Sequence, residues 1–139
     1  MVPTAKPVIS MHALIERARE AQERAHAPYS EYEVGAALRT VDGTVYTGCN
    51  IEFVNYTNTR HAEEVALLKA VEAGERAFDV IAVTSSGLAG RPPCGMCLQS
   101  LTEFCDPDLT ILSDVGDDYR EYTLDEALPG GMPADALVD

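Results

Sequence analysis

Two short motifs constrain this chain more than any other feature. His61 and Glu63 stand one residue apart, and Cys94 and Cys97 follow in the run Pro93-Cys94-Gly95-Met96-Cys97. Imidazole nitrogen and thiolate sulfur are donors that zinc prefers, and a catalytic zinc has three protein ligands and keeps a fourth position for water. We therefore expect Zn²⁺ to be bound by His61, Cys94 and Cys97, with Glu63 as the free carboxylate beside it.

The cysteine spacing suits a single metal ion. If Cys94 opens a helix, its thiol and that of Cys97 lie on one face of that helix. Pro93 and Gly95 are typical of a loop that turns tightly into a helix. The partial positive charge of a helix N-terminus favours thiolates, so this placement supports metal binding.

The histidine is expected on a second helix, over residues 59–73. Apolar residues fill the middle of this segment, and Gly74 is a good stop signal. A helix that starts near residue 58 or 59 would place His61 in its first turn. The N-termini of two helices would then face one ion.

Other interpretations of the cysteines are open. A lone C-x-x-C also occurs in redox pairs and in structural zinc sites, which close with four protein ligands. Cys49 and Cys105 are single and have apolar neighbours, so each is expected to be a small buried residue. His12 and His26 are expected at the surface or at a helix end. The joint occurrence of H-x-E and P-C-x-x-C favours the catalytic site.

Four segments resemble motifs of cytidine deaminases, in the same order. They are Tyr29–Leu38 (Y-S-x-F-x-V-G-A-A-L in that family), Asn50–Glu52 (N-V-E), Cys94–Gln99 (C-G-A-C-R-Q) and Leu128–Met132 (L-L-P-x-x-F). H-x-E followed by P-C-x-x-C is itself the signature of zinc-dependent nucleobase deaminases. The resemblance covers nearly the whole chain.

The resemblance implies hydrolytic deamination of cytidine and deoxycytidine to uridine and deoxyuridine, a reaction of pyrimidine salvage. Glu63 would carry protons from water to the base. The family also implies that the Ala62 N–H binds the base O2. Asn50 and Glu52 would bind the ribose 3′-hydroxyl, and Tyr32 would pack on the base.

Three residues depart from the short, tetrameric members of the family. His61 stands where they have Cys, and Glu64 and Leu98 stand where they have Arg. One neutral imidazole and two thiolates balance the charge of Zn²⁺, so an Arg at position 64 is no longer required. Leu98 has no such explanation in the sequence.

The resemblance implies a homotetramer, with a homodimer as the alternative, and places Tyr56 and Met132 near subunit contacts. A deaminase of a modified cytosine nucleoside such as blasticidin S is an alternative function. A non-catalytic, zinc-stabilised binding module is a third hypothesis, which Glu63 disfavours because such a module needs no proton carrier.

The charge is strongly acidic, with 10 basic and 23 acidic residues and a net charge of −13. This sign opposes binding to nucleic acid, which needs Lys and Arg, but does not affect an uncharged nucleoside. An acidic surface with Lys6 and Lys69 as the only lysines is typical of proteins from high-salt habitats. Four cysteines without a disulfide framework, no visible signal peptide and no apolar membrane span predict a cytoplasmic protein.

One domain is expected over residues 1–139, with 1–9 and 133–139 as loose ends. Hydrophobic periodicity predicts the following elements. Helices are expected over 10–25, 59–73, 94–104 and 124–128, and strands over 34–39, 44–50, 78–84, 109–113 and 119–123. This pattern predicts an α/β fold with helices on both faces of a sheet. The resemblance implies a three-layer α/β/α sandwich with a mixed five-stranded sheet.

Overall fold

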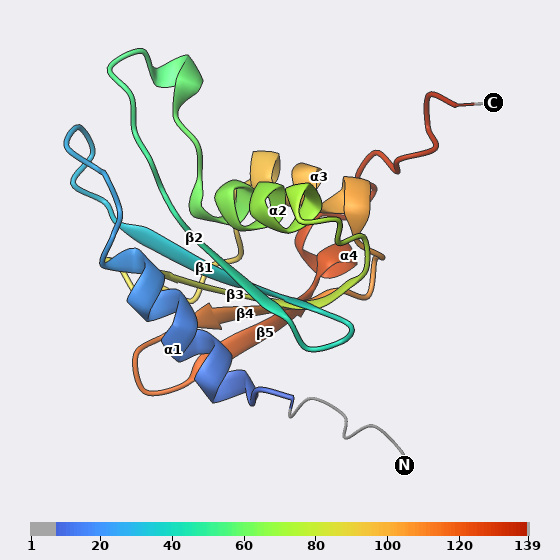
Figure 1. The fold of residues 1–139 in the computed structure, drawn as a ribbon, viewed down its shortest axis with the longest axis horizontal. Coiled ribbons are helices and arrows are strands. Elements are labelled where there is room, and N and C mark those ends of the chain that lie inside the picture. The colour runs from blue at the N-terminus through green and yellow to red at the C-terminus, as the bar shows by residue number, and fades with distance from the viewer. Residues whose placement is uncertain (1–7, 139) are drawn as a thin grey trace.

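The five apolar segments expected as strands form one mixed sheet (Figure 1). A computed structural model describes residues 8–138, so the expectation of a loose end over 1–7 lies outside the described residues. The strands are β1 (Val34–Thr40), β2 (Val45–Cys49), β3 (Phe78–Ser85), β4 (Thr110–Asp114) and β5 (Tyr119–Thr123). Their order is β2-β1-β3-β4-β5, with β3 and β4 parallel and the other pairs antiparallel.

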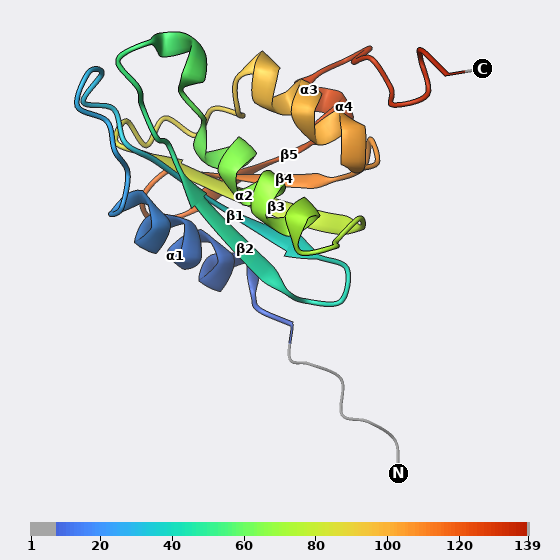
Figure 2. The same cartoon turned by 45° about the horizontal axis from the view of Figure 1, so that its top comes forward.

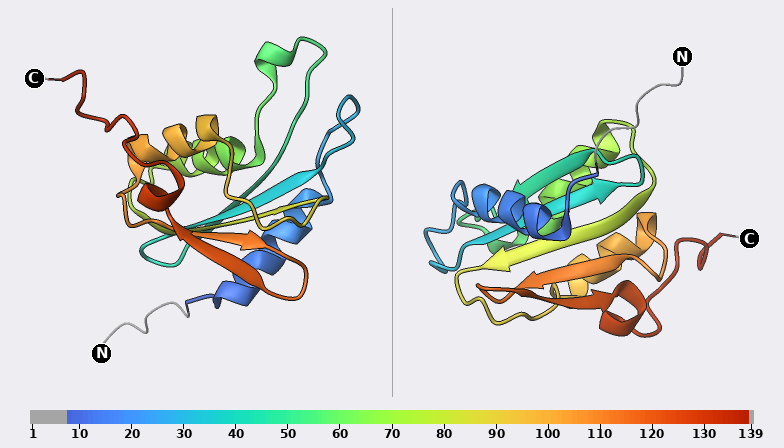
Figure 3. Two further views of the ribbon diagram at one scale, coloured as in Figure 1. Left: turned by 180° about the vertical axis from the view of Figure 1, so that it is seen from behind. Right: turned by 90° about the horizontal axis from the view of Figure 1, so that it is seen from below.

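Helices cover both faces of the sheet. They are α1 (Met11–Gln22), α2 (Ala62–Glu72), α3 (Gly95–Phe104) and α4 (Leu124–Ala127), with a 3₁₀ turn η1 (Tyr56–Asn58) before α2. Figure 3 shows α1 alone on one face, and Figure 2 shows α2 and α3 on the other. The predicted three-layer sandwich is therefore confirmed.

The central strands divide their side chains between two hydrophobic cores, because successive residues of a strand point to opposite faces. Ala36, Leu38 and Ile81 pack with α2, α3 and α4. Ala37 and Val80, each next to one of these residues in the chain, pack with α1. The near-continuous apolar run of β3 thus has the double cover that its sequence predicts.

Helix α1 begins where the sequence predicts and ends earlier. The Ser10 hydroxyl accepts a hydrogen bond from Ala13 N at 3.1 Å and caps the first turn. The expected end at residue 25 is wrong, because the chain leaves the helix after Gln22 and pairs with the segment after β2. His26 N donates to Asn50 O at 3.0 Å, and Glu52 N donates to His26 O at 2.8 Å.

Helix α2 starts three residues later than the expected residue 59. Ile51 and Arg60 exchange both backbone hydrogen bonds, at 2.9 Å each, which keeps Arg60 extended. His61 is therefore the N-cap residue and not a member of the first turn. Gly74, with φ of +98°, follows the end of α2 in the left-handed conformation expected of a stop signal.

The chain ends differ in how they are held. Ile9 packs against the α1 core, and its carbonyl accepts a hydrogen bond from Arg39 Nη1 at 3.0 Å. Near the other end, the Gln99 side chain makes two hydrogen bonds to the backbone of Met132, at 2.8 and 3.1 Å. Residues 133–138 are exposed and form neither helix nor strand. Within residues 8–138, no helix has the length and apolar character that crossing a membrane requires.

Candidate active site

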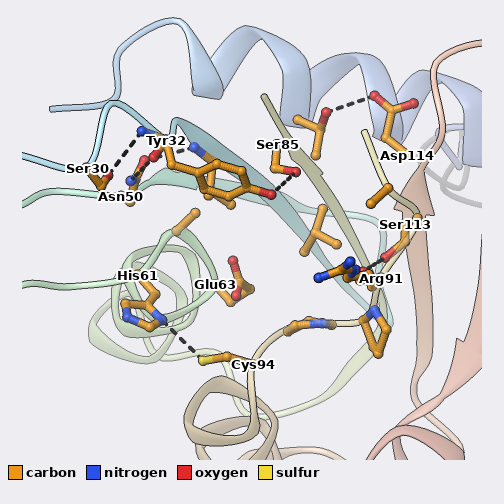
Figure 4. A pocket seen from close by; sticks show the side chains of 18 of the residues that line it. Ser30, Tyr32, Asn50, His61, Glu63, Ser85, Arg91, Cys94, Ser113 and Asp114 are labelled. Atoms are coloured by element: carbon orange, nitrogen blue, oxygen red, sulfur yellow. Dashed lines mark hydrogen bonds between the residues drawn. The ribbon is translucent and has the colours of Figure 1, made fainter. Parts of the chain in front are cut away.

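The three predicted zinc ligands lie together at the starts of α2 and α3. Nδ1 of His61 is 3.1 Å from Sγ of Cys97 and 3.3 Å from Sγ of Cys94, and the two sulfurs are 3.5 Å apart. Figure 4 shows His61 and Cys94 facing each other across the start of α3. Within residues 8–138 this is the one grouping of such side chains able to hold a metal ion, so the predicted convergence is confirmed.

The donor set fits zinc. Bond lengths of about 2.0–2.1 Å to nitrogen and about 2.3 Å to sulfur imply tetrahedral edges of roughly 3.5–3.8 Å. The observed edges of 3.1–3.5 Å need to open by only a few tenths of an ångström. Burial, and then the nearby Glu63 carboxylate, raise the pKa of the Cys97 thiol, so its thiolate needs a cation beside it.

Both helix starts support these ligands. His61 and Cys94 are the N-cap residues of α2 and α3, so the free N–H groups of two first turns surround the donors. The Glu64 carboxylate accepts a hydrogen bond from His61 N at 3.1 Å, as acidic residues at this helix position commonly do. This contact gives Glu64 a local role at a position where the resembled family has Arg.

Leu98 is explained by packing. It is 3% exposed and belongs to the hydrophobic core that α2, α3 and α4 share with the sheet. A charged side chain at this position would be buried among Ala and Leu residues at a large desolvation cost.

Glu63 is the second residue of α2 and points into a cavity (Figure 4). The side chain is buried, with the residue 5% exposed. Burial raises the pKa of this carboxyl above its ordinary value, and a hydrogen bond with Cys97 opposes the shift in part. A carboxyl group whose pKa moves toward neutrality can both take up and release a proton.

The cavity has a volume of about 530 Å³, within the range of small-molecule sites. The predicted site residues that line it are Tyr32, Asn50, Glu52, His61, Ala62, Glu63 and Cys94. Cys97 lies buried behind this surface. The structure therefore brings all the predicted residues to one place.

Asn50 and Glu52 line the cavity and form hydrogen bonds with the segment that precedes β1. Asn50 Nδ2 donates to Tyr32 O at 2.8 Å, and its Oδ1 accepts from Val34 N at 2.9 Å. Glu52 accepts hydrogen bonds from the Ser30 hydroxyl and from the backbone N–H groups of Ser30 and Tyr29. The hydrogen bond from the Ser30 hydroxyl is the main cause that lowers the pKa of Glu52, so this carboxylate is charged at neutral pH.

The cavity also has lining residues that the sequence patterns did not single out, among them Ser30, Ser85, Arg91, Ser113 and Asp114. Ser30 lies inside a family-like motif, which was the available signal. Asp114 belongs to the scaffold, because Arg19 Nε and Nη2 each contact its carboxylate at 2.7 Å. Arg91 points into the cavity (Figure 4), and among the described residues its guanidinium has no hydrogen bond or ion pair.

The fold and the donor cluster define a zinc-binding α/β protein with a cavity beside its metal site. A family model of the cytidine and deoxycytidylate deaminase zinc-binding region matches residues 9–113. Cytidine deaminase of Sporosarcina psychrophila is 39% identical over 130 residues, covering 93% of this chain and 96% of that protein. Cytidine deaminase of Halalkalibacterium halodurans is 42% identical over 127 residues, covering 91% and 96% respectively.

Solved structures agree with these relatives. The crystal structure of cytidine deaminase from Burkholderia pseudomallei superposes with a TM-score of 0.82 at 41% identity, covering 88% of this chain and 99% of that chain. That of cytidine deaminase from Mycobacterium tuberculosis gives a TM-score of 0.77 at 32% identity, covering 88% and 97%. The chain belongs to the cytidine and deoxycytidylate deaminase family.

Proposed function

We propose that this protein is a zinc-dependent cytidine deaminase, which converts cytidine and deoxycytidine to uridine and deoxyuridine with release of ammonia. The observation that carries the proposal is the position of Glu63. Its carboxyl group is buried and faces the cavity directly beside the His61, Cys94 and Cys97 donors. The relatives named cytidine deaminase cover almost the whole chain, which does not favour the blasticidin S alternative.

A zinc ion on the three donors would polarise a water molecule and make it nucleophilic near neutral pH. Glu63 accepts a proton from this water and delivers it to N3 of the pyrimidine while the water oxygen bonds to C4. Glu63 then passes the second proton to the amino group, the bond from C4 to this nitrogen breaks, and ammonia leaves. The raised pKa of Glu63 suits a group that must accept and donate in one cycle.

Other residues orient the nucleoside. Ala62 is the first residue of α2, so its N–H has no acceptor within the helix and is free to bind the base O2. The ring of Tyr32 packs on the base. Asn50, which retains one amide hydrogen, and Glu52 bind the ribose 3′-hydroxyl.

A free nucleoside is favoured over a nucleotide. The Glu52 carboxylate lies at the rim, and the chain carries a net charge of −13. Arg91 is the one Lys or Arg among the described residues that line the cavity. A phosphate would therefore meet more negative than positive charge on entering.

The proposed assembly is a homotetramer, with a homodimer as the alternative. The connection between β2 and α2 projects from the body of the protein (Figure 1) and exposes Phe53, Val54 and Tyr56 by 44, 78 and 75%. Met96 and Met132 are also more than half exposed. Such apolar side chains favour contact with a second copy of the chain. Sedimentation equilibrium measures the assembly directly, and a monomer at all concentrations would refute it.

We also propose that the protein works in a salt-rich cytoplasm, within pyrimidine salvage. Salt screens the mutual repulsion of an acidic surface, so the melting temperature is expected to rise from low to molar NaCl. A melting temperature that falls with added salt would contradict the high-salt habitat.

The test of the function is the loss of cytidine absorbance in the ultraviolet, measured with and without a chelator and combined with metal analysis. Deoxycytidine, blasticidin S, CMP and a cytosine-containing oligonucleotide are assayed in parallel. We expect turnover of cytidine and deoxycytidine, one zinc per chain, and loss of activity on chelation. Stoichiometric zinc without turnover of any substrate would instead identify a binding module.

A further inference from the structure

Tyr32 makes a contact that a phenylalanine cannot make. Its hydroxyl donates a hydrogen bond of 2.7 Å to Oγ of Ser85, a residue 53 positions away in the chain. Figure 4 shows this bond crossing from the loop before β1 to the end of β3, above Glu63. Tyr32 aligns with the Phe of the family motif Y-S-x-F, so the ring is shared with the family whereas the hydroxyl is not.

The phenol end of Tyr32 also lies close to Gly87. A Cβ placed on Gly87 would lie 3.3 Å from the Tyr32 hydroxyl oxygen and 3.5 Å from Cε2. The ring therefore lies against the backbone that follows β3. Both Tyr32 and Ser85 line the cavity, so the hydrogen bond fixes one of its walls.

The backbone of Tyr32 is anchored as well. The Asn50 side chain donates to Tyr32 O at 2.8 Å, and Tyr32 N donates to the Ser30 hydroxyl at 3.0 Å. The Ser30 hydroxyl in turn donates to Glu52. A continuous set of hydrogen bonds thus runs from Glu52, at the rim, through Ser30 and Tyr32 to Ser85.

We propose that Ser85 is a positioning residue, which acts through the Tyr32 hydroxyl to hold the aromatic wall in its substrate-binding position before the substrate arrives. The inference rests on the proposed function, in which the Tyr32 ring packs on the base. A wall that is already ordered spares the substrate the entropic cost of ordering it, which lowers KM. Glu63 lies on α2, and the zinc donors lie at the starts of α2 and α3, so we expect kcat not to depend on this bond.

The test is a double-mutant cycle with Tyr32→Phe, Ser85→Ala and the double variant. For each protein, kcat, KM for cytidine and zinc content are measured. Losing one neutral hydrogen bond is expected to raise KM about three- to tenfold in each single variant. The double variant is expected to match the singles, and kcat and zinc content are expected to stay within about twofold of wild type.

Two controls separate this role from a general weakening of the loop. Ser85→Thr keeps the hydroxyl and should restore KM. Ser86→Ala removes the neighbouring hydroxyl, which bonds only the backbone of Glu33 in the described part of the chain, and should leave KM unchanged.

The outcomes are distinguishable. Additive effects of the two substitutions would show that Ser85 contacts the substrate directly, which overturns the proposal, as would an unchanged KM in Tyr32→Phe or a loss of kcat. All three outcomes leave the proposed function intact, because wild type still deaminates cytidine. A wild-type protein that neither binds nor deaminates cytidine would refute the proposed function and this inference together.

Discussion

Gly48 on β2 lies so close to Ala62, the first residue of α2, that a Cβ at Gly48 would stand 2.3 Å from the Ala62 carbonyl oxygen. The missing side chain therefore lets the start of α2 rest directly on the sheet. His61 and Glu63 flank Ala62, so this contact sets the distance of the His61 imidazole and of the Glu63 carboxyl group from β2.

Gly48→Ala should displace the start of α2 and destabilise the protein by roughly 1–3 kcal/mol. We expect weaker zinc binding and a lower kcat/KM. Metal analysis measures the zinc binding, and the absorbance assay measures kcat/KM. Gly95→Ala is the matched control, because a Cβ at Gly95 meets no atom within 4 Å. If Gly48→Ala binds zinc as tightly as Gly95→Ala does, the close contact does not position the site.

Glu63→Gln should retain zinc and lose most turnover. The amide has nearly the same shape as the carboxyl group but cannot carry a proton, and positioned acid–base groups contribute about 10²- to 10⁴-fold. The assay is kcat for cytidine on protein of known zinc content. Near-normal turnover of the zinc-loaded variant would eliminate Glu63 as the proton carrier.

Glu52→Gln should raise KM for cytidine by about ten- to a hundredfold while leaving the zinc content unchanged, because a charged acceptor for the ribose hydroxyl is lost. Glu33→Gln removes the same charge from an exposed residue outside the set lining the cavity, and serves as the control. Parallel losses of zinc and of substrate binding would assign Glu52 a structural role instead.

Cys94→Ala should abolish stoichiometric zinc binding and lower the melting temperature, because the ion links the start of α2 to the start of α3. A chelator should have the same effect on wild type. Cys49→Ala and Cys105→Ala are expected to keep one zinc per chain. Both thiols are half-buried, not fully buried as expected, and lie outside the cluster of His61, Cys94 and Cys97. Zinc loss in either control would point to a fourth ligand.

Arg19→Ala should lower the free energy of unfolding at pH 7 by about 2–3 kcal/mol, because Asp114 is left buried without its ion pair. Burial alone raises the pKa of Asp114, but hydrogen bonds from Arg19, Gly116 N and Thr84 outweigh it and hold the pKa below its ordinary value. The stabilisation is complete above the unfolded pKa of about 3.9 and is lost as the pH falls through the lower folded pKa.

The difference between wild type and Arg19→Ala should therefore be largest at neutral pH and shrink once the pH falls below about 4, which denaturant titrations at several pH values can follow. Arg17→Ala is the control, since the ion pair of Arg17 with Glu20 is exposed and spans 3.9 Å. Its removal should change stability by less than about 0.5 kcal/mol at any pH. If the loss of unfolding free energy in Arg19→Ala does not change with pH, the electrostatic explanation is wrong.

The elements and the metal donors could be predicted because their signals are local. Apolar periodicity marks the strands, and the residue types of H-x-E and P-C-x-x-C are those that zinc chemistry needs. The start of α2 was misplaced because it depends on the pairing of Arg60 with Ile51, and no local pattern reports that pairing.

Contacts between residues that are distant in the chain could not be predicted from the sequence for the same reason. The bond between Tyr32 and Ser85 joins the loop before β1 to the last residue of β3, 53 positions away in the chain. Leu98 looked anomalous beside the family pattern, and only its burial among the helices of one core explains it. The hydrogen bond from the Asn50 side chain to the Tyr32 carbonyl could not be predicted either, although both residues were expected at the site.

The projecting connection with Phe53, Val54 and Tyr56 has a consequence for enzymology. These side chains are exposed in a single chain, on the connection whose residues Glu52 and Thr59 line the cavity. If neighbouring copies cover them, the smallest catalytic unit is larger than one polypeptide. Turnover per chain would then decline on dilution, so rates measured at nanomolar and micromolar protein would disagree.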